Sequence, residues 1–194
     1  MKTTLLTLSI LLSSLAQLSA QEMTGVFFDP RDGKEYETIF IEVELEGGAT
    51  VMKEWLGQNL NYAMEDGSYC YNNYEEYCDT FGRLYHWKAA LKACPAGWHL
   101  PNDLEISVLT KKHGGTKSAG ASFKEGGESG LNLIMAGFGE ADGTFIDVGV
   151  NGYYWKKSEG SDSPGLLTIH NGVDYFTDES IDASHRNSVR CVRD

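Results

Sequence analysis

Four cysteines have the most definite chemistry in this 194-residue chain: Cys70, Cys78, Cys94 and Cys191. A cysteine thiol can act as a nucleophile, carry electrons, ligate a metal or form a disulfide. The chain contains no Cys-x-x-Cys, which argues against thioredoxin-like redox chemistry and against a zinc ribbon. An even number of cysteines favours structural disulfides if the protein is exported to an oxidising compartment.

Carboxylates offer a second possible chemistry. Glu140, Asp142 and Asp147 flank the turn over 139–149, and oxygen ligands at such short spacing suit Ca²⁺. The alternative, which we favour, is an Asp-Gly hairpin turn with solvated acids. We therefore expect no metal or other cofactor, and these three residues are the candidates if Ca²⁺ does bind.

Motifs typical of enzymes are missing from the sequence. The chain contains no His-Glu-x-x-His, no Gly-x-Ser-x-Gly and no Walker-type phosphate loop. Its five histidines show no metal-ligand spacing, and His99 is expected to be a hydrogen-bonded structural residue. We therefore predict no catalytic residue.

Aromatic residues are the main candidates for ligand binding. The candidates fall into two groups, Tyr153, Tyr154, Trp155 and Glu159 in one, and Tyr71 and Tyr74 in the other. Alternate residues of a strand face opposite sides, so part of the first group should face solvent. Exposed Tyr and Trp rings bind sugars or protein partners with little loss of rotamer entropy. Core packing is the alternative; it is favoured for Trp155 and evenly balanced for the tyrosines near Tyr71.

The charge of the chain limits its partners. With 16 Lys+Arg against 28 Asp+Glu, the formal net charge is -12. Sequence-independent binding of nucleic acid requires basic patches that displace counterions, so nucleic acid is an unsuitable partner. Docking on an anionic membrane surface is disfavoured for the same reason.

The start of the chain resembles a secretory signal peptide. Lys2 precedes an apolar core over residues 5–12, and Leu18-Ser19-Ala20 is typical of a small-residue cleavage site. We predict a signal peptide over residues 1–20 and a single domain over 21–194. The apolar core is shorter than the ~20 residues that a membrane span needs, so we expect a periplasmic, cell-surface or extracellular protein with no span after processing.

The strands expected to position the candidate residues begin with a hairpin. Ile39, Ile41, Val43 and Leu45 alternate with glutamates, which indicates one buried and one wet face. A Gly-Gly turn completes a hairpin over about 35–56. The turn-rich residues 25–34 are expected to form a loop before it.

Two helices should follow. The first is predicted over about 81–93, with Thr80 as its N-cap and Cys94 at its end. The second is predicted over about 103–113, where Asn102 begins a pattern like a capping box.

A surface loop over about 114–129, and then short antiparallel strands with long loops up to residue 194, complete the expected order. A hairpin, two helices and many short strands predict an α+β fold.

Several runs of this chain resemble the Fibrobacter succinogenes major paralogous domain family. They are Asn59–Tyr62, Phe81–Trp87, the Cys-Pro-Ala-Gly-Trp-His-Leu-Pro-Asn-Asp run over 94–103, and the Ser-Val-Arg-Cys-Val-Arg-Asp run over 188–194. The resemblance covers roughly residues 25–194.

This family is similar in layout to C-type lectin-like domains. The resemblance therefore implies an N-terminal strand pair, two helices, a long loop region and two disulfides, Cys94–Cys191 and Cys70–Cys78. The chain departs from the family pattern at Ile106, where a Trp is usual. It departs again at Lys156-Lys157, which adds two positive charges to a strand that could face a ligand.

We expect an exported, non-catalytic binding or adhesion module whose ligand is a polysaccharide, a cell-surface glycan or a protein. This rests on the lectin-like resemblance, the missing enzyme motifs and the available Tyr and Trp residues. The alternatives are an extracellular hydrolase that uses a carboxylate pair and a structural subunit of a cell-surface assembly.

Overall fold

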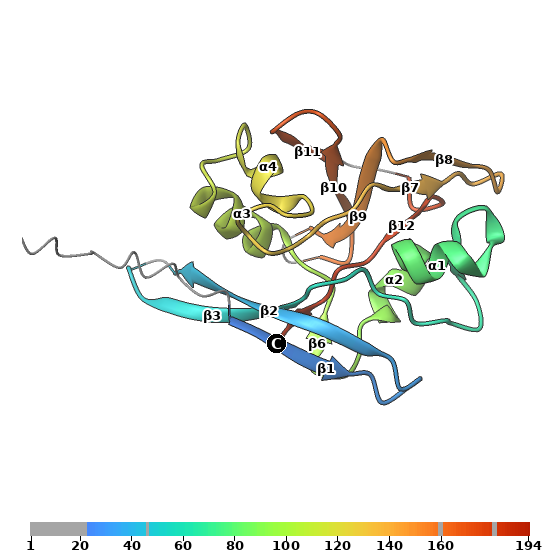
Figure 1. Cartoon of the computed structure of the whole chain (residues 1–194), viewed down its shortest axis with the longest axis horizontal. Helices are drawn as coiled ribbons and strands as arrows, with labels where there is room; N and C mark the ends of the chain where they lie inside the picture. Colours follow the sequence, from blue (N-terminus) through green and yellow to red (C-terminus); the bar gives the residue numbers. More distant parts are fainter. Residues whose placement is uncertain (1–22, 46, 159–160, 180–181) are drawn as a thin grey trace, which may run out of the picture.

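The computed structural model describes residues 23–45, 47–158, 161–179 and 182–194. The predicted signal peptide over 1–20 and the candidate Glu159 lie outside these residues. The described chain has an α+β fold with two β-sheets and several short helices (Figure 1). It contains two disulfides. No helix within the described ranges is long and apolar enough to cross a membrane.

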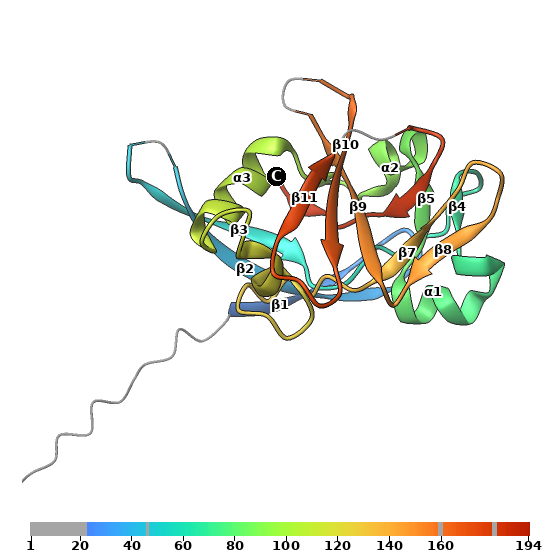
Figure 2. The ribbon, with the colours of Figure 1, turned by 90° about the horizontal axis from the view of Figure 1, so that it is seen from above.

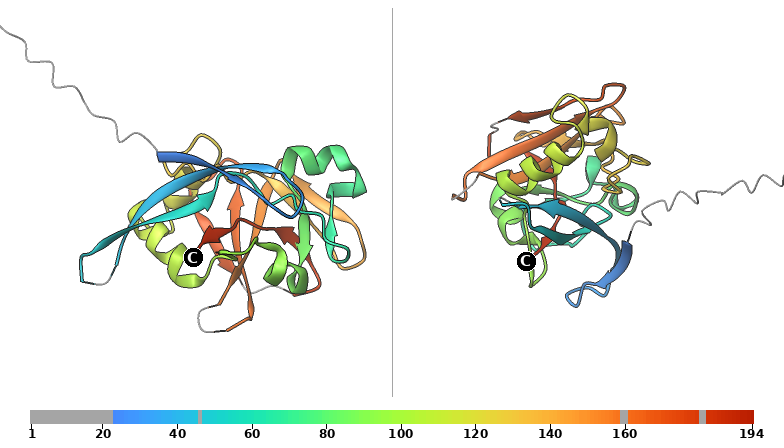
Figure 3. Two further views of the ribbon diagram at one scale, coloured as in Figure 1. Left: turned by 90° about the horizontal axis from the view of Figure 1, so that it is seen from below. Right: turned by 90° about the vertical axis from the view of Figure 1, so that its left-hand side faces the viewer.

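Five strands form the first sheet, which runs along one side of the molecule in the order β1-β2-β3-β13-β6 (Figures 1 and 3). Their bounds are Met23–Phe28 for β1, Glu35–Glu44 for β2, Thr50–Leu56 for β3, Val192–Arg193 for β13 and Trp98–His99 for β6. The antiparallel pairing of β2 with β3 confirms the predicted hairpin. Ile39, Ile41 and Val43 are buried, as their alternation predicts.

The loop predicted over 25–34 is wrong in its first part, because β1 pairs antiparallel with β2. The Phe27 ring of β1 packs against Trp98, with 5.0 Å between the ring centroids. The turn itself begins at Asp29, whose buried carboxylate accepts hydrogen bonds from the backbone and guanidinium of Arg31. The open edge of β2, which local sequence does not reveal, recruits this segment into the sheet.

Eight strands form the second sheet, in the order β11-β10-β9-β7-β12-β5-β4 with β8 paired to β7 (Figure 2). Their bounds are Ser68–Tyr69 for β4, Leu84–His86 for β5, Ala136–Gly139 for β7, Phe145–Val148 for β8, Asn151–Lys157 for β9, Pro164–His170 for β10, Phe176–Glu179 for β11 and Arg186–Ser188 for β12. Most neighbours are antiparallel, but β9 pairs parallel with β7 and with β12, which corrects the purely antiparallel prediction.

Short helices connect the strands. They are the 3-10 turn η1 (Tyr71–Asn73), α1 (Glu75–Phe81), α2 (Trp87–Ala93), α3 (Asp103–Lys112) and α4 (Ala119–Phe123). Helix α3 confirms the second predicted helix to within one residue. Its N-cap Asn102 accepts the Glu105 N–H at 2.9 Å, and the Glu105 carboxylate accepts the Asn102 N–H at 3.1 Å, which completes the capping box.

The first predicted helix, over 81–93, is wrong in its first half. Gly82 ends α1 with a φ of 73°, and a Cβ there would lie 2.7 Å from the Cβ of Asn59. The chain then continues as β5 and becomes helical again only at α2. Thr80 therefore lies in the last turn of α1 and is not an N-cap. The close approach at Gly82 and the pairing of β5 override the helical spacing of the apolar residues.

The surface loop predicted over 114–129 is also corrected, because it contains α4. Ala119 and Phe123 of this helix are completely buried. Between them, Gly120 lies so close to a neighbouring backbone that a Cβ would be 2.5 Å from the carbonyl oxygen of Asp174. Gly120 thus permits close packing here, although the amino-acid composition of residues 114–129 suggests an exposed loop.

Both implied disulfides, Cys70–Cys78 and Cys94–Cys191, are present. Cys94 is the C-cap of α2, and Cys191 directly precedes β13. The second disulfide therefore ties a helix between the two sheets to a central strand of the first sheet.

Replacing both cysteines of the long-range disulfide should cost more stability than replacing both cysteines of the local one. Chain-entropy arithmetic gives about 4.7 kcal/mol for Cys94–Cys191 and about 2.6 kcal/mol for Cys70–Cys78, because the sequence separations are 97 and 8. Urea unfolding of the Cys94→Ala/Cys191→Ala and Cys70→Ala/Cys78→Ala variants measures both losses. Equal losses in the free energy of unfolding would contradict this ranking.

Candidate ligand-binding surface

Figures 1 and 2 show α1 beside the β7–β8 hairpin at one end of the molecule. Aromatic residues of these elements contact one another there. We name this set the aromatic row, and its members are Tyr69, Tyr71, Tyr74, Tyr77, Phe81 and Phe145. The ring centroids lie 6.2 Å apart for Tyr74–Tyr77, 5.7 Å for Tyr77–Tyr71 and 5.4 Å for Tyr71–Phe145. These spacings make the rings one continuous contact series.

Arg186 of β12 joins Tyr69 to the rest of the aromatic row. Its guanidinium carbon lies 4.1 Å from the ring centroid of Tyr69 and 5.6 Å from that of Phe145. Tyr69 also meets His86 edge-on, with 5.3 Å between the centroids. A cation over an aromatic face is attracted by the ring quadrupole, so Arg186 helps to hold both rings in place.

Local backbone geometry presents the tyrosines of this surface. Asn72 and Asn73 have positive φ angles of 52° and 60°, a conformation that asparagine tolerates better than most residues. They turn the chain between Tyr71 and α1, while the Cys70–Cys78 disulfide closes the segment. Tyr77 and Phe81 are four residues apart on α1 and stack with centroids 5.9 Å apart.

The members of the aromatic row differ in exposure. Tyr74 is the most open, at 59% exposed, whereas Tyr71 is buried beneath its neighbours. Tyr69, Tyr77 and Phe145 are partly exposed. The row is therefore a partly open set of rings built on one buried ring, and the two tyrosine candidates of this segment belong to it.

In the other candidate group, Tyr153–Trp155, the core packing favoured for Trp155 is confirmed, and Tyr153 alone keeps partial exposure. Tyr154 and Trp155 are 2% and 1% exposed, so neither can meet a large ligand at the surface. The Tyr154 hydroxyl donates to the Ile134 carbonyl at 2.8 Å, and the Trp155 indole N–H donates to the Tyr85 carbonyl at 2.6 Å. Strand β9 lies between β10 and β7, and Tyr154 and Trp155 belong to two different core clusters, so both of these neighbouring residues are buried.

A comparison with family models matches the Fibrobacter succinogenes major domain over residues 48–193. The chain belongs to this family. No curated protein and no solved structure matches the chain. The match contains both disulfides and the whole aromatic row, whereas β1 and β2 precede it, so the earlier resemblance from residue 25 extends beyond the matched range.

In this Fibrobacter succinogenes major domain, the three Ca²⁺ candidates do not converge. Glu140 pairs with His185 at 3.2 Å. Asp142 accepts bonds from the backbone N–H and hydroxyl of Thr144, which lower the pKa of its carboxyl group. Asp147 accepts the Tyr153 hydroxyl at 2.6 Å. The three carboxylates thus have local partners, as in the Asp-Gly turn that the sequence favours.

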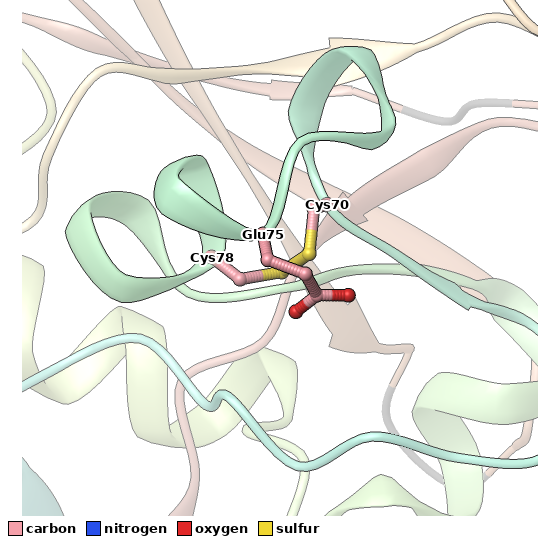
Figure 4. A group of neighbouring side chains, drawn as sticks. All are labelled: Cys70, Glu75 and Cys78. Carbon is pink, nitrogen blue, oxygen red and sulfur yellow. A yellow bond between two sulfur atoms is a disulfide. The ribbon is translucent and has the colours of Figure 1, made fainter.

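One group in the described part of the domain has the spacing of metal ligands, namely Cys70, Glu75 and Cys78 (Figure 4). Its two sulfur atoms are bonded to each other, so neither is a thiolate that could ligate a metal. The Glu75 carboxylate pairs with Arg83 at 2.8 Å. The group is therefore a structural disulfide beside an ion pair.

His99 of the domain lies between two carboxylates. Its Nδ1 is 2.6 Å from the Asp194 carboxylate, and its Nε2 is 3.0 Å from the Glu105 carboxylate. The hydrogen bond to Glu105, opposed in part by burial, raises the pKa of His99. Burial would raise the pKa of Glu105, but the bonds from His99 and Asn102 lower it. Each ring nitrogen of His99 thus faces a carboxylate, which confirms the expected hydrogen bonding and links β6 to α3.

Sequence reasoning missed Phe145 and Arg186, which lie far along the chain from the tyrosines they contact. Tyr69 and Tyr77 were recognisable only as part of a tyrosine-rich segment. A partial signal does exist at Phe145, because the aromatic residue directly follows an Asp-Gly turn that returns the chain to its partner strand.

Trp155→Ala should destabilise the fold by about 3–5 kcal/mol, because it removes a buried indole and its hydrogen bond. Tyr74→Ala is the matched control, since the Tyr74 ring is mostly exposed and should change stability by less than about 0.5 kcal/mol. Chemical denaturation of both variants tests the burial. A Trp155→Ala variant as stable as the control would contradict it.

The His99 network should make stability depend on pH. Because the pKa of His99 is raised in the folded protein, the protonated side chain stabilises the fold fully at pH values below its ordinary pKa of 6.5. This contribution is lost as the pH rises through the folded-state pKa. Because the pKa of Glu105 is lowered, its carboxylate stabilises the fold at pH values above the ordinary pKa of 4.5. That contribution is lost as the pH falls through the folded-state pKa. The network therefore contributes most between these two values.

His99→Gln should remove the loss of stability that the wild type shows on the alkaline side of this range. We expect a change on the order of 1 kcal/mol, because the His99 side chain is 32% exposed and water screens its ion pairs. Thermal unfolding of both proteins from pH 5.5 to pH 9 measures the effect. The same pH profile in both would show that His99 does not hold its proton as proposed.

Proposed function

We propose that this protein is an exported, non-catalytic module that binds a polysaccharide or cell-surface glycan through the aromatic row. The observation that carries the proposal is the continuous series of rings from Tyr74 to Phe145, partly open over the buried Tyr71 and joined to Tyr69 by Arg186. Sugar rings present apolar C–H faces that stack on aromatic side chains, and their hydroxyl groups remain free for polar neighbours.

The rigidity of the row supports this proposal. Tyr71 is buried under its neighbours, Arg186 lies over Tyr69, and the Cys70–Cys78 disulfide closes the segment that carries the tyrosines. A surface that is already ordered loses little conformational entropy when a ligand binds. Tyrosine adds large contact area with only two side-chain torsions to fix.

The C-type lectin-like layout is part of the proposal. The order of an N-terminal hairpin, α2, α3 and an irregular region, with Cys94 bonded to Cys191 beside the closing strand β13, agrees with that layout. Such a frame allows loops to vary while disulfides and helices hold the core. This support comes from analogy of fold, so the site itself must carry the function.

Two disulfides favour a protein that works outside the reducing cytoplasm. Together with the signal-like residues 1–20, they support an exported location at the periplasm, the cell surface or outside the cell. A polymeric glycan is a ligand available in all three places.

The carboxyl groups weigh against the alternative of an extracellular hydrolase. A glycosidase needs one acid whose pKa is raised, so that it can donate a proton to the leaving group. Four carboxyl groups of the described residues have a lowered pKa, the opposite of what such an acid needs: Asp29, Glu105, Asp142 and Asp182. These groups are held as carboxylates by hydrogen bonds, which suits structural roles.

Tyr74→Ala and Tyr77→Ala should each weaken binding to the recognised glycan by about fivefold in Kd, since a stacked ring contributes about 1 kcal/mol. A glycan array and pull-down on insoluble polysaccharides identify the ligand, and titration of the variants measures the loss. Tyr175→Ala is the matched control, because that ring is 48% exposed and precedes β11, at the opposite edge of the second sheet from β4.

If Tyr175→Ala weakens glycan binding as much as Tyr74→Ala and Tyr77→Ala do, the binding site is not the aromatic row. If the wild type binds no polysaccharide or arrayed glycan, the proposed function is wrong, and a protein ligand or a structural role in an assembly becomes the better account.

A further inference from the structure

A polar groove of about 600 Å³ adjoins the aromatic row. It lies between the end of α1, the segment after β3, the start of β2 and residues 125–134. The lining residues that matter for the argument are Gln58, Asn59, Asn61, Thr80, Phe81 and Arg190. The volume is within the range of sites for small molecules and is large enough for one or two sugar units.

The groove and the aromatic row share a residue. Phe81 lines the groove, and its ring stacks on Tyr77 of the row with an interplanar angle of 28°. Cys78 and Thr80 of the same helix also line the groove. A chain of sugars lying over Tyr77 would therefore reach the groove without leaving the surface of α1.

The chemistry of the groove suits hydroxyl groups. Its lining includes Gln58 and Asn61, whose side-chain amides can both donate and accept hydrogen bonds. One atom of a lining residue, the Oδ1 of Asn61, has no hydrogen-bond partner among the described residues. This wall therefore keeps hydrogen-bonding capacity that the described part of the protein does not use.

The base of the groove is already ordered. Arg190 is only 2% exposed, and its guanidinium donates to the Asn59 side chain at 2.7 Å and to the Leu131 carbonyl at 2.7 Å. Asn59 in turn donates to the Phe81 carbonyl at 2.9 Å. A ligand would meet a preformed wall, which reduces the entropy lost on binding.

The charges at the rim select against acidic sugars. Glu35, Glu37, Asp79 and Glu125 are exposed and line the groove. The ammonium group of Lys34, also at the rim, donates to the Asn61 carbonyl. A sugar that carries a carboxylate would approach several like charges, whereas an uncharged sugar would not.

We propose that this groove is a subsite for one or two neutral sugar units of a glycan whose adjacent units lie on the aromatic row. The proposal rests on the proposed function for the identity of the polymer. It adds a second recognition element, which selects units by their hydroxyl groups and by their lack of charge, whereas the row stacks on any sugar face.

The test uses the full mature chain and a tryptophan that fills the groove. Thr80→Trp places an indole at the groove wall, and Thr80 is exposed with its hydroxyl bonded only to its own helix. Ser107→Trp is the matched control, because Ser107 is an exposed hydroxyl residue in α3, away from the groove lining. The probes are cellobiose, mannobiose, chitobiose and the acidic digalacturonate, titrated by isothermal calorimetry.

We expect at least one neutral disaccharide to bind, Thr80→Trp to weaken that binding by at least about tenfold, and Ser107→Trp to leave it unchanged. Tyr74→Ala should spare the disaccharide and weaken only the polymer. As a measurement that needs no variant, NMR titration of the wild type should shift the backbone amide signals of residues 57–61 and 80–82.

Four results would overturn the groove proposal: no disaccharide binding, unchanged binding by Thr80→Trp, amide shifts confined to other segments, or tighter binding of digalacturonate than of the neutral sugars. If the polymer still binds the wild type and binds more weakly to Tyr77→Ala, the aromatic row remains the site and only the groove fails. If no polymer binds, the proposed function fails, and disaccharide titration still decides whether the groove is a sugar site.

Discussion

The buried guanidinium of Arg190 is the interaction on which the rest of the structure depends. It donates to the carbonyls of Leu56, Leu131 and Asn132 and to the side chain of Asn59, so one side chain joins the end of β3 to the segment before β7. Burial lowers its pKa to about 10, which still leaves it protonated at neutral pH. Burying a charge is costly, and hydrogen bonds to several oxygen acceptors offset that cost. The next residue, Cys191, forms the long-range disulfide, so polar and covalent links act at the same point of the fold.

A series of short contacts connects Arg190 to the candidate site and holds that site in place. Asn59 is held by Arg190 and holds the Phe81 carbonyl, and Gly82 packs so closely on Asn59 that a side chain there would clash. The end of α1 is thereby fixed, and with it the stacked rings of Phe81 and Tyr77. The local disulfide then orders the start of the same segment. The aromatic row is rigid because core interactions hold the backbone that carries it, and not because its rings pack on one another alone.

The sequence predicts those parts of this fold whose determinants are local. The hairpin follows from the alternation around Ile41, and α3 follows from the capping box at Asn102. The elements that the sequence does not predict depend on contacts between distant segments. Strand β1 forms on the edge of β2, and β5 forms by pairing with β12. Helix α4 packs against residues near Asp174. The site follows the same rule. The tyrosines clustered around the local disulfide are visible in the sequence, whereas Arg186 and Phe145 reach them only through the second sheet, and the burial of Trp155 follows from sheet order.

The two lysines that depart from the family pattern bear on where the proposed ligand selection would reside. Because they directly follow Tyr153–Trp155 in the sequence, Lys156 and Lys157 suggest a cationic strand that faces a ligand. Lys156 is instead buried and paired with Asp103 at the first turn of α3, and Lys157 pairs with Asp162 at 2.7 Å. A paired charge offers an approaching ligand little net field. Selection by charge would then come from the exposed acids around the polar groove, and selection by shape from the aromatic row, so relatives could change ligand by substitution at α1 and the rim without disturbing the strand that carries these lysines.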